Sequence, residues 1–442
     1  MSRRHLYRRA TVAYHRALNY LVFLGRCGSE LLVGGPGYFA WMGILMTLAL
    51  LGLNAYCRQI VYGLYTTAMT DQVSWGIYIA NFTFLVGMAA SSVMLVIPVY
   101  IYKDEALKHV VILGELLAVA CITMCLLFVT VDLGRPDRFW HLVPGLGKFH
   151  WPVSMLTWDV IVLNGYLLLN AWICGYLIYA EYRQRKPTRR FYIPFVFISV
   201  FWALSIQGVE AFLYVGLGGR PFWNSAVIAP RFLASAFASG PAFLVLTLQL
   251  IRRFTSYEVE DAALLRLRQV IQISMVFTVF LLICELFTEF YTGANHVVSV
   301  MYLFFGLDGH YGLVSWIWVA LVCEVTALVL LLLPVSRSLL YLDIACVFVV
   351  VGIWIDKGMG LIVPAFIPTP LGEIVEYQPT LNEWLVSWGI WAFGLMLYTA
   401  FLKMTIPVLT GKLRLHQANR MPHALTHAPS KELVAPAATA EG

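Results

Sequence analysis

The chain has 442 residues, of which 60% are hydrophobic and only 12% are charged. A soluble domain carries about twice that share of charge, and the mean hydropathy of +0.77 excludes a soluble globular enzyme. The net charge of +6 comes from basic residues in short connections between apolar runs, which indicates membrane topology and not nucleic-acid binding. The composition therefore predicts a polytopic membrane protein.

Ten segments are apolar and long enough to cross a bilayer core, which takes roughly 20 helical residues. In chain order they are residues 37–57, 75–101, 109–131, 155–180, 191–217, 229–252, 269–293, 312–333, 339–362 and 384–410. The sequence thus predicts an all-α membrane domain over 37–410. A basic cytoplasmic arm over 1–36 precedes this domain. A tail over 411–442 follows it; the tail lacks apolar periodicity and is expected to be disordered.

The basic residues are divided unevenly between the two sides of this domain. Of the 30 Lys and Arg residues, 22 fall on the side of the two termini and 5 on the opposite side. The positive-inside rule then places both termini in the cytoplasm and the domain in a bacterial inner membrane. The three longest connections, 132–154, 294–311 and 363–383, all fall on the outer side, where we expect a partner protein to dock.

Several acidic residues lie inside the predicted spans, where an ionisable group is expensive and indicates a function. Glu115 falls toward the cytoplasmic side, Glu210 in the outer half of its span and Glu324 nearer the middle. Carboxylates at graded depths can relay protons through water. The alternative for each is a helix cap, an ion pair with an arginine, or support for packing.

Glu285 and Glu289 stand one helical turn apart on one face of span 269–293. Two adjacent buried carboxylates do not both ionise cheaply. Either one of them holds a proton near neutral pH, or a cation such as Lys357 neutralises the pair; a structural ion pair between Lys357 and its neighbour Asp356 is an equal alternative. The predicted proton-transfer residues are Glu115, Glu210, Glu285, Glu289 and Glu324.

Polar residues also gather near the outer ends of the early spans. Tyr78 and Asn81 lie close to the start of one span and Asp159 close to the start of another, so they are predicted to converge at one depth. No histidine lies in mid-span and no Cys-x-x-Cys occurs, so neither a bound haem nor another bound metal is expected. A diffusible quinone fits, because its ring accepts hydrogen bonds from His, Asn or Tyr and carboxylates take the protons released on oxidation.

One region resembles a landmark of the NrfD/polysulfide-reductase membrane-subunit family, with the sequences DLGRPDRFWHL at 132–142 and FHWPVSM at 149–155. Pro136 ends a helix and holds the preceding Arg135 in extended geometry, which presents the charged groups at the outer rim. Asp132 and Arg135 are expected to lie close enough to pair.

Three further stretches strengthen the resemblance: SWGIYIANFTFLVG at 74–87, WIDKGMG at 354–360 and FIPTPLGEIVEY at 366–377. With ten spans the chain is similar to the DsrP branch, the quinone-interacting subunit of the DsrMKJOP complex of dissimilatory sulfur metabolism. The resemblance implies two four-helix bundles with flanking helices, a quinol site at the outer end of the first bundle, and a periplasmic ferredoxin-like iron–sulfur subunit beside it. Other membrane and cytochrome subunits would complete the complex.

The resemblance assigns Asp132, Arg135 and His141 to the quinol site by their match to the landmark segment. Asp132 and His141 would bind or deprotonate the ring, and Arg135 would tune Asp132. Depth in the membrane adds three more residues, so that the predicted quinone-binding set is Asp132, Arg135, His141, Tyr78, Asn81 and Asp159. Menaquinone or ubiquinone would enter as an exchangeable substrate, and the family lacks a metal cofactor of its own.

Two other classes of function remain open on the sequence. A proton-coupled transporter also has ten spans and midplane carboxylates, with its substrate site at interrupted helices in repeated halves. Gly240-Pro241 interrupts one span, but no matching break is evident in a related half. A passive membrane anchor of a redox complex would tolerate substitutions in the outer polar residues without loss of electron transfer.

Overall fold

The structure is a computed structural model that describes residues 14, 18–100, 107, 110–143, 145–293 and 297–415. Within these residues it is helical and has no β-strand. Residues 1–13 and 15–17 of the predicted arm and 416–442 of the predicted tail lie outside the described residues. Ten helices are long and apolar enough to cross a membrane in the part of the chain that is described, which confirms the predicted all-α polytopic fold.

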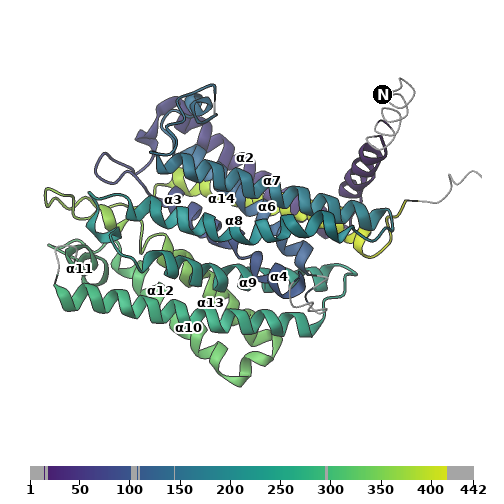
Figure 1. Ribbon diagram of the computed structural model, residues 1–442. Helices are drawn as coiled ribbons and strands as arrows, with labels where there is room; N and C mark the ends of the chain where they lie inside the picture. Colours follow the sequence, from purple (N-terminus) through teal and green to yellow (C-terminus); the bar gives the residue numbers. More distant parts are fainter. Residues whose placement is uncertain are drawn as a thin grey trace, which may run out of the picture.

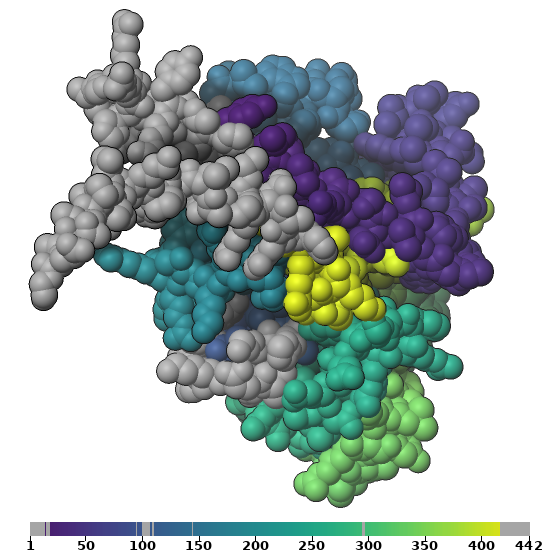
Figure 2. Space-filling view, turned by 90° about the vertical axis from the view of Figure 1, so that its right-hand side faces the viewer, coloured from purple at the N-terminus to yellow at the C-terminus, as the bar shows by residue number. Residues whose placement is uncertain are grey.

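These helices are, in order, α2 (Pro36–Tyr62), α3 (Ile77–Ala90) continued by α4 (Val93–Tyr100), α6 (Val111–Asp132), α7 (Met155–Tyr182), α8 (Arg189–Val215), α9 (Ile228–Phe254), α10 (Asp261–Thr292), α12 (Val314–Leu332), α13 (Leu339–Lys357) and α14 (Leu381–Leu409). Both the N-terminal part of the chain and the end of α14 lie at the same end of the helices (Figure 1), as an even number of crossings requires. Figure 2 looks onto that end, with the last described residues in yellow beside the purple N-terminal segment.

The helices form two four-membered rings. Helices α3, α6, α7 and α8 pack on one another as the first bundle, and α9, α10, α12 and α13 as the second (Figure 1). Helix α3 also packs against α9 and α13, so it is the main contact between the bundles. Helices α2 and α14 lie along each other, and α14 packs on the first bundle through α6.

Among the helix boundaries that differ from the sequence-based expectation, two have local reasons. Helix α10 begins at Asp261, eight residues before the predicted span, because its buried Arg268 finds partners in the last turn of α12 and the 3-10 turn after it: Nε donates to Ser336 Oγ at 2.7 Å and Nη2 to the Leu331 carbonyl at 2.9 Å. Helix α13 ends five residues early, at Lys357, where Gly358 approaches closely to the first bundle.

The segment that follows α13, residues 358–367, is buried although it is not α-helical. A Cβ at Gly358 would lie 2.8 Å from the Cβ of Ala80 in the first bundle, and one at Gly360 would lie 3.2 Å from Ile317 in the second. The carbonyl of Leu361 accepts a 2.9 Å hydrogen bond from the Trp223 indole. Buried irregular backbone at membrane depth occurs where protein surrounds it, so this segment fills the junction of the two bundles.

Candidate functional site

The end of the first bundle that we predict to face outward holds a partly buried carboxylate, Asp132, the last residue of α6. Its Oδ1 atom is buried and has no hydrogen-bond partner among the described residues. Glu383 at the start of α14 is near enough for the two charges to interact. A buried acceptor without a partner costs free energy unless water or a ligand pairs with it. Asp132 is therefore a candidate for ligand contact.

Tyr78 lies close to Asp132 and Glu383, as the prediction of a shared site requires. Its hydroxyl donates a 2.8 Å hydrogen bond to Gln59 Oε1, and Gln59 Nε2 donates in turn to the carbonyl of Val131 at 2.7 Å. This chain of hydrogen bonds holds the ring of Tyr78 against the end of α6. The phenol oxygen keeps acceptor capacity, because its own proton is committed to Gln59.

Glu383 is fully engaged and organises the loops around this site. Its Oε1 accepts a 2.6 Å hydrogen bond from the Tyr377 hydroxyl, and its Oε2 accepts from the backbone amides of Ala68 (2.9 Å) and Thr380 (2.8 Å). The Tyr377 oxygen also accepts from the amide of Ile77 at 2.8 Å. Burial, followed by the charge of Glu383, raises the pKa of Tyr377, so this phenol stays a donor at neutral pH.

Further polar groups lie in the interior of the same bundle. Asp159 of α7 and Glu210 of α8 are buried and close enough for their charges to interact. Asp159 Oδ1 and both carboxylate oxygens of Glu210 lack a hydrogen-bond partner in the part of the chain that the structure describes. Beside them the Tyr214 hydroxyl and Thr83 Oγ1 share a 2.5 Å hydrogen bond. The bundle thus encloses several acceptors that need protons, water or a ligand.

Asn81, which the depth argument placed with Tyr78 and Asp159, makes its contacts with other helices. Its Oδ1 accepts hydrogen bonds from the indoles of Trp354 (3.0 Å) and Trp391 (2.8 Å), and its Nδ2 donates to the carbonyl of Ile77. The amide therefore joins α3 to α13 and α14. These hydrogen bonds indicate a packing function for Asn81.

Arg135 and His141 lie at the rim of the bundle. Arg135 binds Asp137 through two hydrogen bonds, Nε to Oδ1 at 3.0 Å and Nη2 to Oδ2 at 2.9 Å, and these bonds lower the pKa of Asp137. The expected pairing of Arg135 with Asp132 is wrong, because a helical turn begins at Pro136 and brings Asp137 to the guanidinium. His141 is exposed and stacks on Trp140 with ring centroids 3.9 Å apart.

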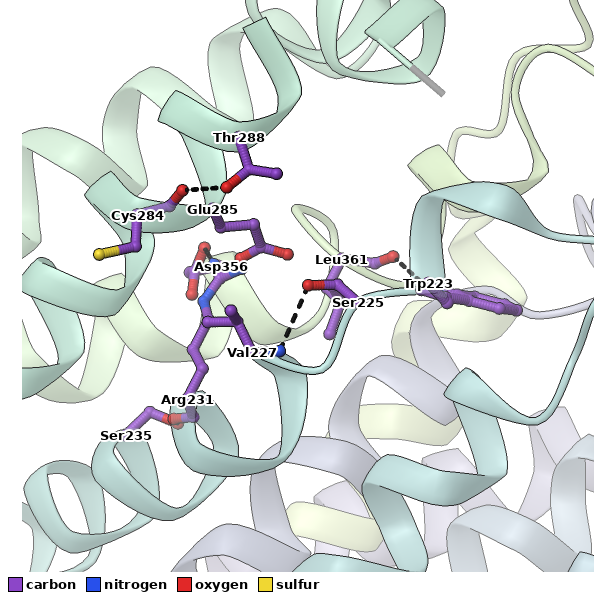
Figure 3. A network of polar contacts seen from close by, with 10 residues as sticks. All are labelled: Trp223, Ser225, Val227, Arg231, Ser235, Cys284, Glu285, Thr288, Asp356 and Leu361. Atoms are coloured by element: carbon purple, nitrogen blue, oxygen red, sulfur yellow. Dashed lines mark hydrogen bonds and ion pairs between the residues drawn. The ribbon is translucent and has the colours of Figure 1, made fainter. Parts of the chain in front are cut away.

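The second bundle contains a buried ion-pair cluster (Figure 3). Arg231 of α9 points toward α10 and α13, where Nη1 binds Glu285 Oε2 and Nη2 binds Asp356 Oδ1 at 2.5 Å. Two expectations are corrected here: the cation at Glu285 is Arg231 and not Lys357, and Asp356 pairs with Arg231 and not with its chain neighbour. The fork of the guanidinium reaches two carboxylates at once, which a single ammonium does less well.

A cavity of about 20 Å³ adjoins this cluster, lined by Arg231, Glu285, Glu289 and Asp356 and by apolar side chains such as Phe304. That is room for one water molecule and too little for an aromatic ring. Glu324 of α12 lies near enough to Asp356 and Arg231 for their charges to interact, and neither of its oxygens has a hydrogen-bond partner among the described residues. The second bundle can hold protons but offers no ring-sized pocket here.

Glu115 stands apart from the other predicted proton-transfer residues. It is buried near the start of α6, where its Oε2 accepts a 3.3 Å hydrogen bond from the thiol of Cys174 in α7. The structure therefore divides the predicted set among three places: Glu210 in the first bundle, Glu285, Glu289 and Glu324 in the second, and Glu115 alone near the opposite end of α6 from Asp132. Among the described residues, no group of three or more His, Cys, Asp or Glu is placed to hold a metal ion.

Sequence reasoning missed four residues of these clusters: Gln59, Arg231, Tyr377 and Glu383. Arg231 had a usable signal, because it is one of only three basic residues inside the predicted spans. Gln59 follows the predicted end of the first span by two residues, so it was assigned to a connection. Tyr377 ends the stretch 366–377 that carries the resemblance, and Glu383 closes a Thr-x-x-Glu capping-box pattern at the start of α14, but their contacts with Ile77 and Ala68 depend on how a distant loop folds back.

Several known proteins are similar to this chain in amino-acid sequence. The model of the family described as polysulphide reductase, NrfD, matches residues 65–365. A selenate reductase subunit of Mesobacillus selenatarsenatis is 22% identical, with 87% of this chain and 97% of that protein covered. An Hdr-like menaquinol oxidoreductase integral membrane subunit of Archaeoglobus fulgidus is also 22% identical, over 83% of this chain and 93% of that protein.

A protein named as a dimethyl sulfoxide reductase membrane subunit in Halobacterium salinarum is 28% identical over a shorter stretch, 55% of this chain and 59% of its own length. All three relatives bear the names of subunits of reductases or oxidoreductases. The matched family region takes in more than half of the chain, including all the helices of both bundles. The chain belongs to the polysulphide reductase NrfD family of polytopic membrane proteins.

Proposed function

We propose that this chain is the quinone-interacting membrane subunit of a multi-subunit redox complex. It exchanges two electrons between the membrane quinone pool and an iron–sulfur subunit on the outer side. The observation that carries the proposal is the set of buried acceptors without partners in the first bundle, at Asp132, Asp159 and Glu210 among the described residues. The name of the Archaeoglobus relative, a menaquinol oxidoreductase subunit, supports it.

The arrangement suits a quinol because each ring hydroxyl must give up a proton when two electrons leave. Asp132 accepts a hydrogen bond from one hydroxyl and takes its proton, since its Oδ1 has no competing donor among the described residues. Tyr78 is held in place by Gln59 and borders the ring. Glu210, deeper in the bundle, accepts a proton passed inward through water, and Asp159 lies close enough to Glu210 for their charges to interact.

The rim residues form the entrance and the docking surface. Arg135 and His141 lie on the outer connection that follows α6, where exposed Phe139 and Trp140 also project. Exposed aromatic residues are enriched at protein interfaces. We assign this connection to contact with the periplasmic iron–sulfur subunit, so that an electron leaving the quinol has a short path to its acceptor.

The finer assignment is a DsrP-like subunit in dissimilatory sulfur metabolism, seated in a bacterial inner membrane with both termini in the cytoplasm. Ten spans and the asymmetry of the basic residues support it. Purification of the intact complex from native membranes tests the assignment by the subunits that accompany the chain. A ferredoxin-like protein and a cytochrome are expected; molybdenum-containing reductase subunits in their place would assign the chain to another branch.

The first experiment is binding of heptyl-hydroxyquinoline N-oxide, a fluorescent quinol mimic, to the purified protein. We expect saturable quenching in the parent and at least a tenfold weaker affinity in Asp132→Asn, which is about 1.4 kcal/mol; His141→Ala, on the docking surface, should instead weaken quinol-dependent reduction of the partner. The matched control is Asp71→Asn, which alters an exposed acid on the same outer side. Absence of saturable binding to the folded parent would reject the proposal, and solute uptake into liposomes would then separate a transporter from a passive anchor.

A further inference from the structure

Lys357 is a buried cation at the junction of the two bundles that the proposed function leaves unexplained. It is the last residue of α13, and only 2% of it is exposed. Its Nζ atom has no hydrogen-bond partner among the described residues and lies 4.3 Å from the centre of the Phe232 ring. A desolvated ammonium without hydrogen bonds is costly. The side chain therefore needs electrostatic partners nearby.

Those partners come from both bundles. Glu210 of α8 belongs to the first bundle, and Asp356 and Arg231 belong to the second; all three are near enough to interact with the charge of Lys357. Helix α3 lies between these groups and contributes no charged side chain. Gly87 of α3 is close to Lys357, because a Cβ at Gly87 would stand 3.1 Å from the Lys357 Nζ. The missing side chain at Gly87 leaves the path between Lys357 and the first bundle open.

The distribution of buried charge makes Lys357 the only available cation for Glu210 in the described part of the chain. Within the described residues, the buried basic residues are Arg231, Arg268 and Lys357, and none of them belongs to α3, α6, α7 or α8. Arg231 already binds Glu285 and Asp356, and Arg268 lies near the cytoplasmic end of α10. The bundle with the proposed quinol site thus takes its positive charge from the other bundle.

We propose that Lys357 couples the two bundles, facing Glu210 while that carboxylate is ionised and turning to Asp356 when Glu210 takes up a proton. The inference rests on the proposed function, because the proton that reaches Glu210 is one released from quinol. The lysine side chain is flexible enough for such a movement. Interactions between charges are strong where water is excluded. Movement of the Lys357 ammonium toward Asp356 therefore weakens the ion pair between Arg231 and Asp356.

The consequence reaches the rest of the second bundle. The charged groups around Lys357 are Glu210 of α8, Arg231 of α9 and Asp356, the residue before Lys357 in α13. Helix α3 contributes none. Behind these stand Asp159 of α7, Glu285 of α10 and Glu324 of α12. When Lys357 approaches Asp356, Arg231 is released toward Glu285 and toward Glu324, and the oxygens of Glu324 have no hydrogen-bond partner among the described residues. Protonation in one bundle thereby changes the ion pairs of the other.

The test uses the intact complex in proteoliposomes, with menadiol oxidation measured across a pH series and binding of heptyl-hydroxyquinoline N-oxide measured alongside. In Lys357→Met we expect unchanged affinity for the mimic, turnover at least tenfold lower and a shifted pH profile. Lys357→Arg should recover most of the turnover, because it keeps the charge. The matched control is Lys403→Met, which removes another lysine from a membrane helix, one that packs over Tyr38.

The double variant separates coupling from a general structural role. If Lys357 acts on Glu210, the loss of turnover in the double variant, Glu210→Gln together with Lys357→Met, is no larger than the loss of turnover in either single variant. A parental pH profile in Lys357→Met, or losses that add up in the double variant, would overturn the inference while the quinol site stands. Failure of the parent to bind the mimic would instead reject the proposed function.

If Lys357→Met does not yield folded protein, Gly87→Ala decides the question. The added methyl narrows the path between Nζ and the first bundle without removing any charge. We expect the same direction of shift in the pH profile and lower turnover, with affinity for the mimic retained. Parental turnover and pH profile in a folded Gly87→Ala complex would contradict the coupling.

Discussion

At the scale of single residues, Asn81 shows how one side-chain amide joins three helices. Its oxygen accepts both the Trp354 and the Trp391 indole N–H groups. In Asn81→Leu these two donors lose their acceptor inside the protein, and each buried unpaired donor costs about 1–3 kcal/mol. We therefore expect the free energy of unfolding to fall by about 2 kcal/mol or more, measured as a lower unfolding temperature in detergent.

The matched control is Asn164→Leu in α7. Asn164 donates one hydrogen bond to the carbonyl of Val160 in its own helix and is only half-buried. Its substitution should lower the unfolding temperature much less, and both variants should keep binding the quinol mimic. Loss of binding in Asn81→Leu with parental stability would make Asn81 a ligand contact after all, as its depth in the membrane first indicated.

The contrast between Asn81 and Asp132 shows what the sequence reveals of a membrane site. Depth follows from counting residues along a span, so the position of Asp132, Asp159 and Glu210 toward one shared end of their helices could be predicted. The direction in which a side chain points depends on which helices are neighbours. Neither the partner of Arg231 nor that of Asn81 could be predicted, because each lies more than 50 residues away in the chain.

At the scale of helices, α2 and α14 approach most closely where Gly52 faces Gly389. A Cβ at Gly52 would lie 2.5 Å from the Gly389 Cα, and small residues let membrane helices pack at such short range. Gly52→Ala should therefore push the helices apart and cost about 1–3 kcal/mol of stability, measured as a lower unfolding temperature. Gly43→Ala in the same helix has no atom within 4 Å of the added Cβ and is the matched control.

Because alanine favours helix over glycine, Gly43→Ala should leave stability unchanged or raise it slightly. An equal loss in the two variants would show that the close crossing contributes nothing beyond local helix geometry. The pair thus separates packing between α2 and α14 from the helix propensity of α2 itself. Gly52 gave no such indication in the sequence, where it is one of several glycines in α2.

The two connections that we predict to lie on the outer side, before α12 and before α14, are joined to each other by Glu376. Its Oε1 accepts hydrogen bonds from the amide of Gly312 (2.8 Å) and the hydroxyl of Tyr302 (3.2 Å), and His310 Nδ1 lies 3.5 Å from Oε2. Partial burial alone would raise the pKa of Glu376, but these hydrogen bonds and the charge of His310 bring it below its ordinary value.

The pKa of Glu376 is lower in the folded protein than in the unfolded chain. The ionised carboxylate therefore stabilises the folded connection at pH values above the pKa that Glu376 has in the unfolded chain. That contribution is lost as the pH falls through the folded pKa. We therefore expect amide hydrogen exchange of residues 306–313 to accelerate as the pH drops from about 6 to about 3, after correction for intrinsic rates. In Glu376→Gln the extra acceleration should be absent; a parental pH dependence in that variant would assign the effect to another group.

The helices themselves were largely predictable because twenty apolar residues in a row leave little choice in a bilayer. The exceptions are positions where tertiary contacts outweigh local hydropathy. Arg268 stays within α10 because the end of α12 and the turn after it each offer it one acceptor, and Gly358 ends α13 where α3 comes close. Local composition does not encode either contact.

At the scale of the whole molecule, the predicted orientation determines what the buried acceptors of the first bundle can do. If the side with 22 basic residues faces the cytoplasm, then Asp132 and the connection after it face the periplasm. Protons released by quinol there leave on the periplasmic side, apart from the one that passes inward to Glu210. The reverse orientation would place the partner subunit in the cytoplasm.

Labelling of single cysteines with a membrane-impermeant maleimide tests the orientation. Gln72 on the outer connection after α2 and Thr188 before α8 are both exposed and uncharged, so cysteine at either position leaves the basic residues untouched. A background without the accessible Cys57 and Cys284 is needed. We expect Gln72→Cys to react in intact spheroplasts and Thr188→Cys to react only after permeabilisation. The opposite pattern would overturn the orientation and move the proposed electron acceptor to the cytoplasm, even if the quinol mimic still binds at Asp132.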